Sequence, residues 1–209
     1  MPQDPSVKNL IFDLGGVILD LSVDKTLQAF STVSGLDKTM VRDRFLSSSG
    51  FEAYEKGELS DAEFRDFVRE VYTVKVSDQV IDQCWNAMLV GIPLVKLDLL
   101  SQLMNSHRVY LLSNTNNIHL SYIQKIIMPA LGENKVLDDY FHRAYYSHLM
   151  KKRKPDADIF EQVLEENGLH ANESLFLDDN EANIAGANAL GIKTLHVPHP
   201  DLILTYFHA

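Results

Sequence analysis

The sequence predicts a doubly wound α/β fold, in which helices cover both faces of a parallel sheet and a helical segment is inserted near the N-terminus. Two observations support this prediction. Short apolar runs alternate with amphipathic stretches over residues 91–209, which is typical of a parallel sheet. Residues 24–90 show helical periodicity without a strong strand signal. We therefore expect a Rossmann-like core of residues 1–22 and 91–209, with a four-helix cap domain at residues 23–90.

Size and charge restrict the possible partners. The chain has 209 residues and 45% hydrophobic content, enough for one core and a modest insertion. Its net charge of −10 disfavours binding to nucleic acid or to anionic membranes. The single cysteine, Cys84, cannot form an internal disulfide, and no secretory signal or membrane-length apolar run is present. We expect a cytoplasmic protein that binds a small molecule, as a monomer or weak dimer.

The first predicted element is a strand from Val7 to Phe12. It is largely apolar and ends at Asp13, which Gly15 and Gly16 follow closely. A buried strand that stops at a carboxylate and two glycines is typical of an active-site edge in an α/β sheet.

The inserted segment reads as helical throughout. Leu27 and Phe30 are an example of its helical spacing, and Ser60 with Glu63 forms a capping-box pattern that places a helix start near residue 60. A Gly-Ile-Pro sequence at residues 91–93 marks the return to the core.

The rest of the chain predicts alternating helices and strands. We expect helices at 95–104, 118–128, 156–167 and 182–190, strands at 108–112, 143–146, 174–177 and 193–197, and a short final helix ending at 207. Parallel strands place their carboxyl ends on one edge of the sheet, where ligands bind in such folds.

Polar residues follow several of these strands. Asp13 follows the first, Ser113-Asn114 the second and Asp178-Asp179 a later one, while Lys154 precedes a proline at a helix start. Each alone is ordinary turn or cap chemistry. In this order, and at these strand ends, they indicate a shared site.

The chemistry of this set favours phosphoryl transfer. Asp13 can attack phosphorus and form an aspartyl-phosphate. Neighbouring carboxylates repel each other unless a cation lies between them, and such oxygen-rich sites suit Mg²⁺. The Ser113 hydroxyl, the Asn114 backbone N–H and the Lys154 ammonium could hold the phosphoryl oxygens. We also interpret the basic run at residues 151–154 as positive charge gathered at this site.

Four ordered segments carry a family resemblance. They are Ile11–Val17, Leu111–Thr115, Lys154–Asp156 and Phe176–Asp179, the last accompanied by Asn183 and Gly186-Ala187. They resemble the four motifs of the haloacid dehalogenase-like (HAD) hydrolase superfamily, and the helical insertion resembles its C1-type cap. More narrowly, Phe51–Phe64 and Ser113–Asn117 are similar to bacterial α-glucose-1-phosphate phosphatases.

The resemblance implies a role for each matched polar residue. Asp13 would be the nucleophile and a metal ligand, the Gly15 carbonyl a second ligand, and Asp179 the main fourth-motif ligand with Asp178 close behind it. Ser113 and Asn114 would bind phosphate, Lys154 would bridge Asp13 and phosphate, and Asn183 would support the metal shell. The paired aspartates favour a phosphatase over a dehalogenase.

Gly15 departs from the pattern of many superfamily phosphatases, which carry a general acid–base aspartate there. Such a group contributes typically about 10²–10⁴-fold. Another group could substitute for it, with Asp178, Asp20, Asp24 and Glu52 as candidates. Alternatively, the substrate has a more acidic leaving hydroxyl, as a sugar 1-phosphate has, or catalysis is slow or lost.

Substrate choice is expected to depend on the cap. Glu52, Tyr54, Glu55 and Lys56 are candidate contacts for sugar hydroxyls, although residues 55–58 could equally form a solvated helix end. Phe51, Phe64 and Trp85 are expected in the cap core. His119 could line the mouth of the site, but a position on an exposed helix face is favoured.

The sequence therefore predicts a Mg²⁺-dependent phosphatase for a small phosphomonoester. A sugar phosphate such as glucose 1-phosphate is favoured. The alternatives are another phosphorylated metabolite, such as a nucleotide or flavin mononucleotide (FMN), or a weakly active HAD-like protein with a binding or regulatory role.

Overall fold

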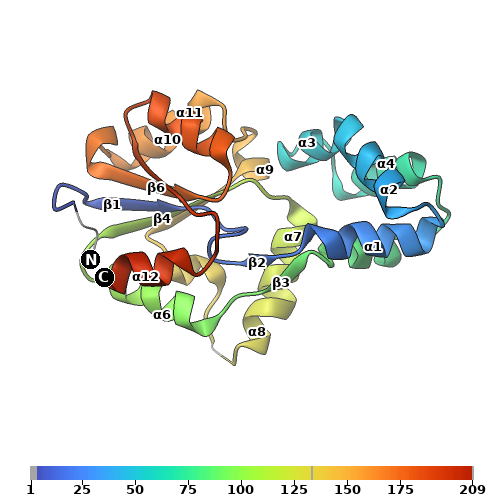
Figure 1. Ribbon diagram of the computed structural model, residues 1–209, viewed down its shortest axis with the longest axis horizontal. Coiled ribbons are helices and arrows are strands. Elements are labelled where there is room, and N and C mark those ends of the chain that lie inside the picture. Colours follow the sequence, from blue (N-terminus) through green and yellow to red (C-terminus); the bar gives the residue numbers. More distant parts are fainter. Residues whose placement is uncertain (1–3, 133, 209) are drawn as a thin grey trace.

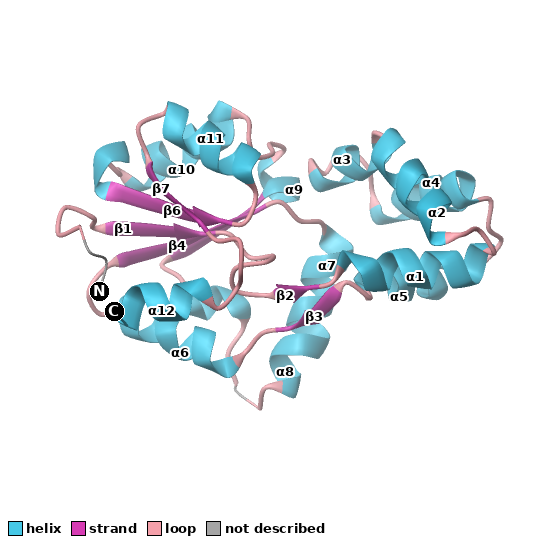
Figure 2. Cartoon of the chain, viewed as in Figure 1, coloured by secondary structure: helices cyan, strands magenta, loops and turns pink. Residues whose placement is uncertain are grey.

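The computed structural model describes residues 4–132 and 134–208, and within them a five-stranded parallel sheet forms the centre of the molecule (Figures 1 and 2). Its strand order is β5-β4-β1-β6-β7. The strands are β1 (Asn9–Phe12), β4 (Arg108–Ser113), β5 (Arg143–Tyr146), β6 (Ser174–Asp178) and β7 (Lys193–His196). All four pairings are parallel. The predicted α/β fold is confirmed.

Side chains alternate between the two faces of the sheet, and both faces are buried. On β1, Leu10 and Phe12 join one hydrophobic cluster while Ile11 joins the other. Strand β6 repeats this alternation, with Leu175 in the first cluster and Phe176 in the second. Apolar residues on both faces explain why these strands read as continuous apolar runs.

Helices cover each face of the sheet (Figure 2). The core helices are α6 (Leu94–Leu103), α7 (Asn117–Tyr122), α8 (Met128–Ala130), α9 (Ser147–Met150), α10 (Ala157–Asn167), α11 (Glu181–Ala189) and α12 (Leu202–His208). Helices α10 and α11 lie on one side of the sheet, and α6 and α12 lie on the other. Three further helical turns belong to the core: the π-helix η1 (Ile123–Ile127) and the 3₁₀ turns η2 (Leu137–Tyr140) and η3 (Ala171–Glu173).

The predicted single helix at 118–128 is wrong in one respect. The chain forms α7, then the π-helical turn η1, then α8. Pro129 lies in the first turn of α8 and has no N–H to donate, so regular α-helical hydrogen bonding cannot run through it. None of the described helices is long and apolar enough to cross a membrane.

The strand order places the switch point at β1. From β1 the chain moves to β4 and β5 on one side, then crosses back to β6 and β7 on the other. The carboxyl ends of β1, β4 and β6 therefore border the crevice where ligands bind in doubly wound folds.

Five helices, rather than the predicted four, lie in the insertion, all of whose residues are described. They are α1 (Val23–Ser34), α2 (Lys38–Ser47), α3 (Gly50–Glu55), α4 (Asp61–Tyr72) and α5 (Asp78–Asn86). The additional helix is α3, whose six residues are too few to show helical periodicity. The predicted capping box of Ser60 and Glu63 begins α4.

The insertion has a hydrophobic cluster of its own. It is rich in aromatic side chains and includes Phe51, Phe64 and Trp85, as predicted. It also includes Ile118, which belongs to α7 of the core. We propose residues 23–90 as a cap domain because this cluster is separate from those that flank the sheet.

Two short strands connect the cap to the core. Strands β2 (Asp20–Leu21) and β3 (Leu89–Gly91) pair antiparallel where the chain leaves and re-enters the core (Figure 1). Strands of two and three residues show no alternation, so the sequence predicted neither.

Candidate active site

A buried ion-paired triad occupies the switch point of the sheet. Lys154 Nζ lies 2.7 Å from Asp13 Oδ1, 2.7 Å from Asp178 Oδ2 and 2.8 Å from the Leu112 carbonyl oxygen. The Lys154 side chain is fully buried. All three ammonium protons therefore have acceptors, which a buried cation requires.

The triad has perturbed proton affinities. Burial raises the pKa of Asp13 to about 7, and the Asp178 carboxylate adds to this effect while Lys154 opposes it. Burial works against the Lys154 ammonium, but Asp13 and Asp178 outweigh it and raise the pKa of Lys154. Lys154 is therefore charged, and its charge opposes the protonation of Asp13.

Asn114 holds the Lys154 backbone in place. Its side-chain oxygen accepts a hydrogen bond from Lys154 N at 2.9 Å, and its Nδ2 donates to Lys154 O at 2.9 Å. Gly186 provides the space for this loop, because a Cβ there would lie 2.5 Å from the Pro155 carbonyl oxygen. Asn114, which the sequence predicts as a phosphate ligand, thus positions the lysine in the structure.

Asp178 is saturated with hydrogen bonds. Besides Lys154, it accepts from the Asn183 Nδ2, at 3.1 and 3.0 Å to its two oxygens, and from Asn180 N at 2.8 Å. Asn183 therefore supports the site by orienting Asp178. No lone pair of Asp178 needs a metal to be satisfied, which fits a place behind Asp179.

Asp13, Asp178 and Asp179 offer carboxylate oxygens within 4.8 Å of one another. Burial raises the pKa of Asp179, and the nearby Asp178 charge adds to this shift. Gly16 has a φ of +76°, and a Cβ there would lie 2.2 Å from Asp179 Oδ2, so a larger residue would displace that carboxylate. These hard oxygen donors fit Mg²⁺.

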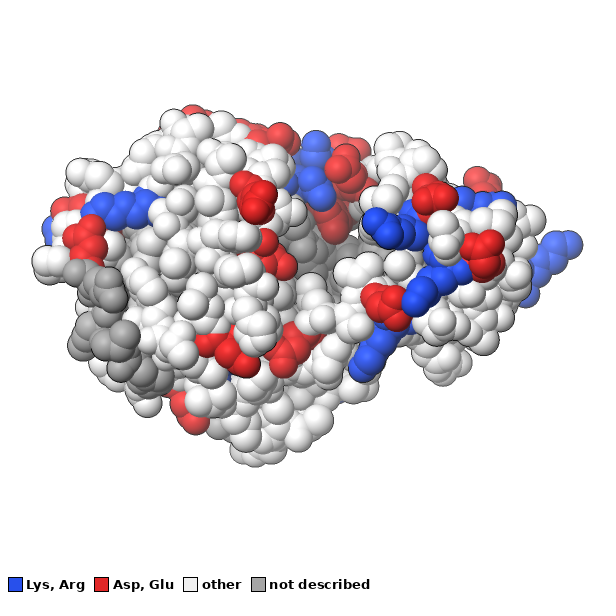
Figure 3. Space-filling view, viewed as in Figure 1, with Lys and Arg blue, Asp and Glu red and all other residues white. Residues whose placement is uncertain are grey.

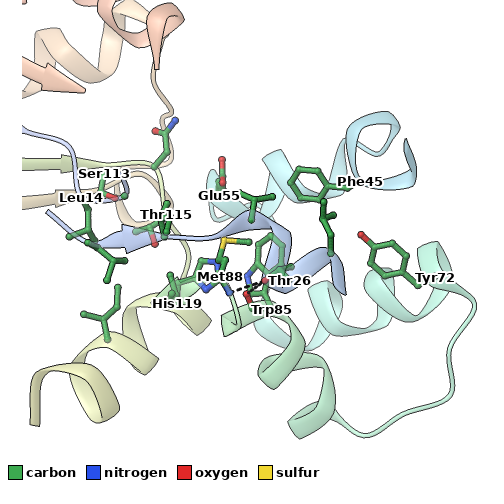
Figure 4. Close-up of a pocket in the computed structure, with 18 residues that line it drawn as sticks. Leu14, Thr26, Phe45, Glu55, Tyr72, Trp85, Met88, Ser113, Thr115 and His119 are labelled. Carbon is green, nitrogen blue, oxygen red and sulfur yellow. Dashed lines mark hydrogen bonds between the residues drawn. The ribbon is translucent and has the colours of Figure 1, made fainter. Parts of the chain in front are cut away.

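A cavity of about 220 Å³ lies next to the triad, between core and cap. Ser113 and Asn114 line its core end, beside Gly15. Figure 4 shows Ser113 and Leu14 at this end and Phe45 and Tyr72 at the opposite, cap end. Most of the wall is apolar, including Leu14, Leu19, Leu27, Phe45, Met88 and Ile123.

Of the four predicted specificity residues, Glu55 lines this cavity. Its carboxylate accepts a hydrogen bond from Arg153 Nε at 2.8 Å. Glu52 pairs with the same arginine at 3.4 Å and Lys56 with Asp156 at 3.7 Å, both outside the cavity. These contacts join α3 and the residue after it to the loop that carries Lys154.

The fourth predicted residue, Tyr54, lies in the cap core. Its hydroxyl donates to Asp61 Oδ1 at 2.7 Å and accepts from Ile118 N at 3.2 Å. It therefore connects the cap to the N-terminus of α7 and does not line the cavity.

The basic run at 151–154 does not gather at one site. Lys154 enters the triad, but Lys151 donates to the Gly57 carbonyl and Lys152 pairs with Asp158. The run lies in a loop, so successive side chains diverge toward the core, the cap and α10. In Figure 3, charged side chains of both signs border the hollow between core and cap.

The sequence left two positions open for His119, and the favoured one, on an exposed helix face, is wrong. The ring is buried, lines the cavity, and stacks on Trp85 with centroids 4.8 Å apart. The N-cap residue Asn116 places it, accepting a hydrogen bond from His119 N at 3.0 Å. The Asn116-to-His119 spacing predicts only the helix N-cap, and no sequence signal near His119 indicated that Trp85 covers the ring.

Three of the four candidate replacements for an acid at Gly15 are engaged in ion pairs outside the triad. Asp20 pairs with the buried Lys96 at 2.8 Å, Asp24 with Lys38 at 2.6 Å and Glu52 with Arg153. The fourth, Asp178, is buried in the triad, and none of the four lines the cavity. A Cβ at Gly15 would lie 2.6 Å from Leu21 Cδ1, so the β2 side chain occupies the space of the missing group.

Comparison with known proteins decides the family. Residues 7–191 match the haloacid dehalogenase-like hydrolase family. This chain is a HAD-like hydrolase. The match spans the triad, the carboxylate cluster and the whole insertion, so the superfamily predicted from the ordered motifs is confirmed.

Several relatives of this HAD-like hydrolase are informative. The D-ribitol-5-phosphate phosphatase of Bacteroides thetaiotaomicron is 33% identical over 189 residues, which is 90% of each chain. A HAD family enzyme of the same organism, solved in complex with magnesium and inorganic phosphate, is 40% identical with a TM-score of 0.82, over 91% of this chain and 93% of that one. A predicted HAD-like hydrolase from Porphyromonas gingivalis is 30% identical with a TM-score of 0.83, over 91% of both chains.

Proposed function

We propose that this HAD-like hydrolase is a Mg²⁺-dependent phosphatase that forms an aspartyl-phosphate on Asp13. The observation that carries this proposal is the position of the Asp13 carboxylate. It lies at the switch point of the sheet, paired with a buried ammonium and within a carboxylate cluster. The relatives, one named as a phosphatase and one solved with magnesium and phosphate, support the same chemistry.

In the proposed mechanism, one Asp13 oxygen attacks the substrate phosphorus as the bond to the alcohol oxygen breaks. The alcohol oxygen leaves with the bonding electrons and is protonated by solvent. Water then attacks the phosphorus of the aspartyl-phosphate, which releases inorganic phosphate and restores Asp13.

The residues around Asp13 have distinct proposed tasks. Lys154 offsets negative charge as the phosphate approaches, and the Ser113 hydroxyl with the Asn114 N–H binds phosphoryl oxygens. Asp13, Asp179 and the Gly15 carbonyl would hold Mg²⁺, with Asp178 behind them. Bound Mg²⁺ would supply positive charge against the phosphoryl oxygens.

The substrate is proposed to be the phosphate of a small alcohol, a sugar or a polyol. A cavity of about 220 Å³ is below the roughly 300–1,000 Å³ usual for drug-sized ligands, which disfavours a nucleotide or FMN. Glucose 1-phosphate remains a candidate because an anomeric hydroxyl leaves without a strong acid. D-ribitol 5-phosphate is a second candidate because a relative is named for it.

The test is phosphate release from a panel of phosphorylated metabolites, with Mg²⁺ and with a chelator, for wild type and Asp13→Asn. The panel contains both candidates, a sugar 6-phosphate, a nucleotide and FMN. Mg²⁺-dependent release that disappears in the variant supports the proposal. Faster turnover of the sugar 6-phosphate than of glucose 1-phosphate would exclude the anomeric preference.

A folded protein that binds Mg²⁺ but releases no phosphate from any compound would favour the binding or regulatory alternative. Gly15, which supplies no general acid, is the feature that would explain this outcome.

A further inference from the structure

His119 is held in one orientation by two contacts from the cap. Its ring stacks on Trp85 at an interplanar angle of 9°, and its Nδ1 lies 2.8 Å from Asn86 Oδ1. Both partners belong to α5, whereas His119 belongs to α7 of the core. The ring is thus fixed at the junction of the two parts, in the wall of the substrate cavity.

The Asn86 contact fixes the tautomer. An amide oxygen only accepts hydrogen bonds, so His119 Nδ1 carries the proton and Nε2 carries a lone pair. Burial lowers the pKa of His119 to about 3, so the ring is neutral near pH 7. Nε2 makes no hydrogen bond with any residue that the structure describes, which leaves an oriented acceptor in the wall.

Two of the other polar side chains in the wall, Thr26 and Glu55, already have partners, whereas the Tyr72 hydroxyl at the cap end makes no hydrogen bond within the described part of the chain. The Thr26 hydroxyl lies within hydrogen-bond distance of the Cys84 and Trp85 carbonyls and accepts from Met88 N. Glu55 already accepts from Arg153. Figure 4 shows His119 beside Trp85 and Met88, between the core end and the cap end of the cavity.

We propose that His119 is a specificity-determining residue, whose Nε2 accepts a hydrogen bond from a hydroxyl of the substrate's alcohol portion. This inference rests on the proposed phosphatase function. The His119 contact would select phosphate esters whose alcohol portion carries at least one further hydroxyl. The carbon skeleton of that alcohol would pack against the apolar wall. A site built to bind a hydroxyl discriminates strongly against analogues that lack it, since its polar group is then left unpaired.

The test compares His119→Phe with wild type on two substrates. D-ribitol 5-phosphate carries hydroxyls on its alcohol portion, and phenyl phosphate carries none. Phenylalanine can still stack on Trp85. We expect kcat/KM for D-ribitol 5-phosphate to fall about tenfold to a hundredfold more than kcat/KM for phenyl phosphate. Equal losses on both substrates, as a purely structural role would give, would overturn the proposal.

Asn86→Ala is the second variant. It keeps the stacking of His119 on Trp85 but removes the acceptor that holds the proton on His119 Nδ1. It should shift the substrate preference in the same direction, by a smaller factor. His170→Phe is the matched control, since His170 is exposed and distant from the cavity wall. A preference shift as large in the control as in His119→Phe would also overturn the assignment.

Binding measured without turnover separates this inference from the proposed function. D-ribitol 5-phosphate is titrated into Asp13→Asn with and without His119→Phe. The double variant should bind at least about tenfold more weakly. Weaker binding without any wild-type turnover would support the His119 contact and refute the phosphatase. Equal binding by both proteins would refute the contact, whatever the turnover.

Discussion

The Lys154 ammonium lies 2.7 Å from both Asp13 Oδ1 and Asp178 Oδ2, so one buried cation separates two buried carboxylates. The arrangement leaves the two oxygens of Asp178 fully occupied, while Asp13 stays slightly exposed at the crevice. One carboxylate is therefore structural and the other is available for chemistry. The lysine stabilises both, which connects the stability of the fold to the function of the site.

Lys154→Met should destabilise the protein in chelator by about 3 kcal/mol, because it leaves two buried carboxylates without their cation. Mg²⁺ should restore part of the loss by replacing the missing charge. Urea denaturation with and without Mg²⁺ measures both effects. Lys152→Met, at a half-exposed pair, should change the free energy of unfolding by less than about 1 kcal/mol. Equal effects of the two variants would contradict the prediction.

Asp179→Asn should weaken Mg²⁺ binding at least about tenfold, because it removes an anionic ligand from the carboxylate cluster. At a Mg²⁺ concentration a hundred times the wild-type Kd, the free energy of unfolding of wild type should rise by about 2.7 kcal/mol. That of the variant should rise much less. Calorimetric titration and thermal unfolding check these expectations. Asp201→Asn, at an exposed position, serves as the control. Unchanged Mg²⁺ affinity in Asp179→Asn would remove this residue from the metal site.

Gly15→Asp combined with Leu21→Ala should add a general acid. The Leu21 side chain occupies the position of the new Cβ, so the second substitution makes room for it. Relative to Leu21→Ala alone, turnover of an alkyl phosphate should rise about 10²-fold. Turnover of p-nitrophenyl phosphate, whose leaving group needs no proton, should change little. A similar gain on both substrates would mean that the aspartate acts in some other way.

Acid should destabilise wild type more steeply than His119→Phe. Burial lowers the pKa of His119 from its usual 6.5 to about 3, so between these values the unfolded chain binds a proton that the folded protein does not. Above pH 6.5 the buried neutral ring has no such cost. Below pH 6.5 the free energy of unfolding falls by up to about 1.4 kcal/mol per pH unit because of His119. Urea denaturation from pH 7.5 to 4.5 measures the two slopes. Parallel stability curves would show that the ring is not held neutral.

The strands and the residues that end them could be predicted because their signals are local. An apolar run ending in Asp13 or Asp178 reports both the strand and its functional edge, and the parallel topology brings those edges together. Lys154 does not end a strand, and it was located instead by the proline that follows it at a helix start and by its place in the order of the four motifs.

The cavity wall could not be predicted in the same way. His119 was assigned to an exposed face because no local pattern showed that Trp85, more than thirty positions earlier, covers it. Tyr54 and Glu55 are adjacent in sequence, yet the Tyr54 hydroxyl joins the cap to the core, whereas Glu55 lines the cavity. These differences depend on how the cap packs on the core, which involves contacts distant in sequence.

The presence of Ile118 in the hydrophobic cluster of the cap has a consequence for protein engineering. Its backbone N–H bonds to Tyr54, and its neighbour Asn117 donates to Asp61 Oδ2 at 2.7 Å. The start of α7 is therefore shared by both parts of the molecule. A chimera that receives a foreign cap at residues 23–90 alone would carry mismatched partners at this junction. The transplantable unit also includes residues 116–119, so new substrate preferences are best sought by exchanging both segments together.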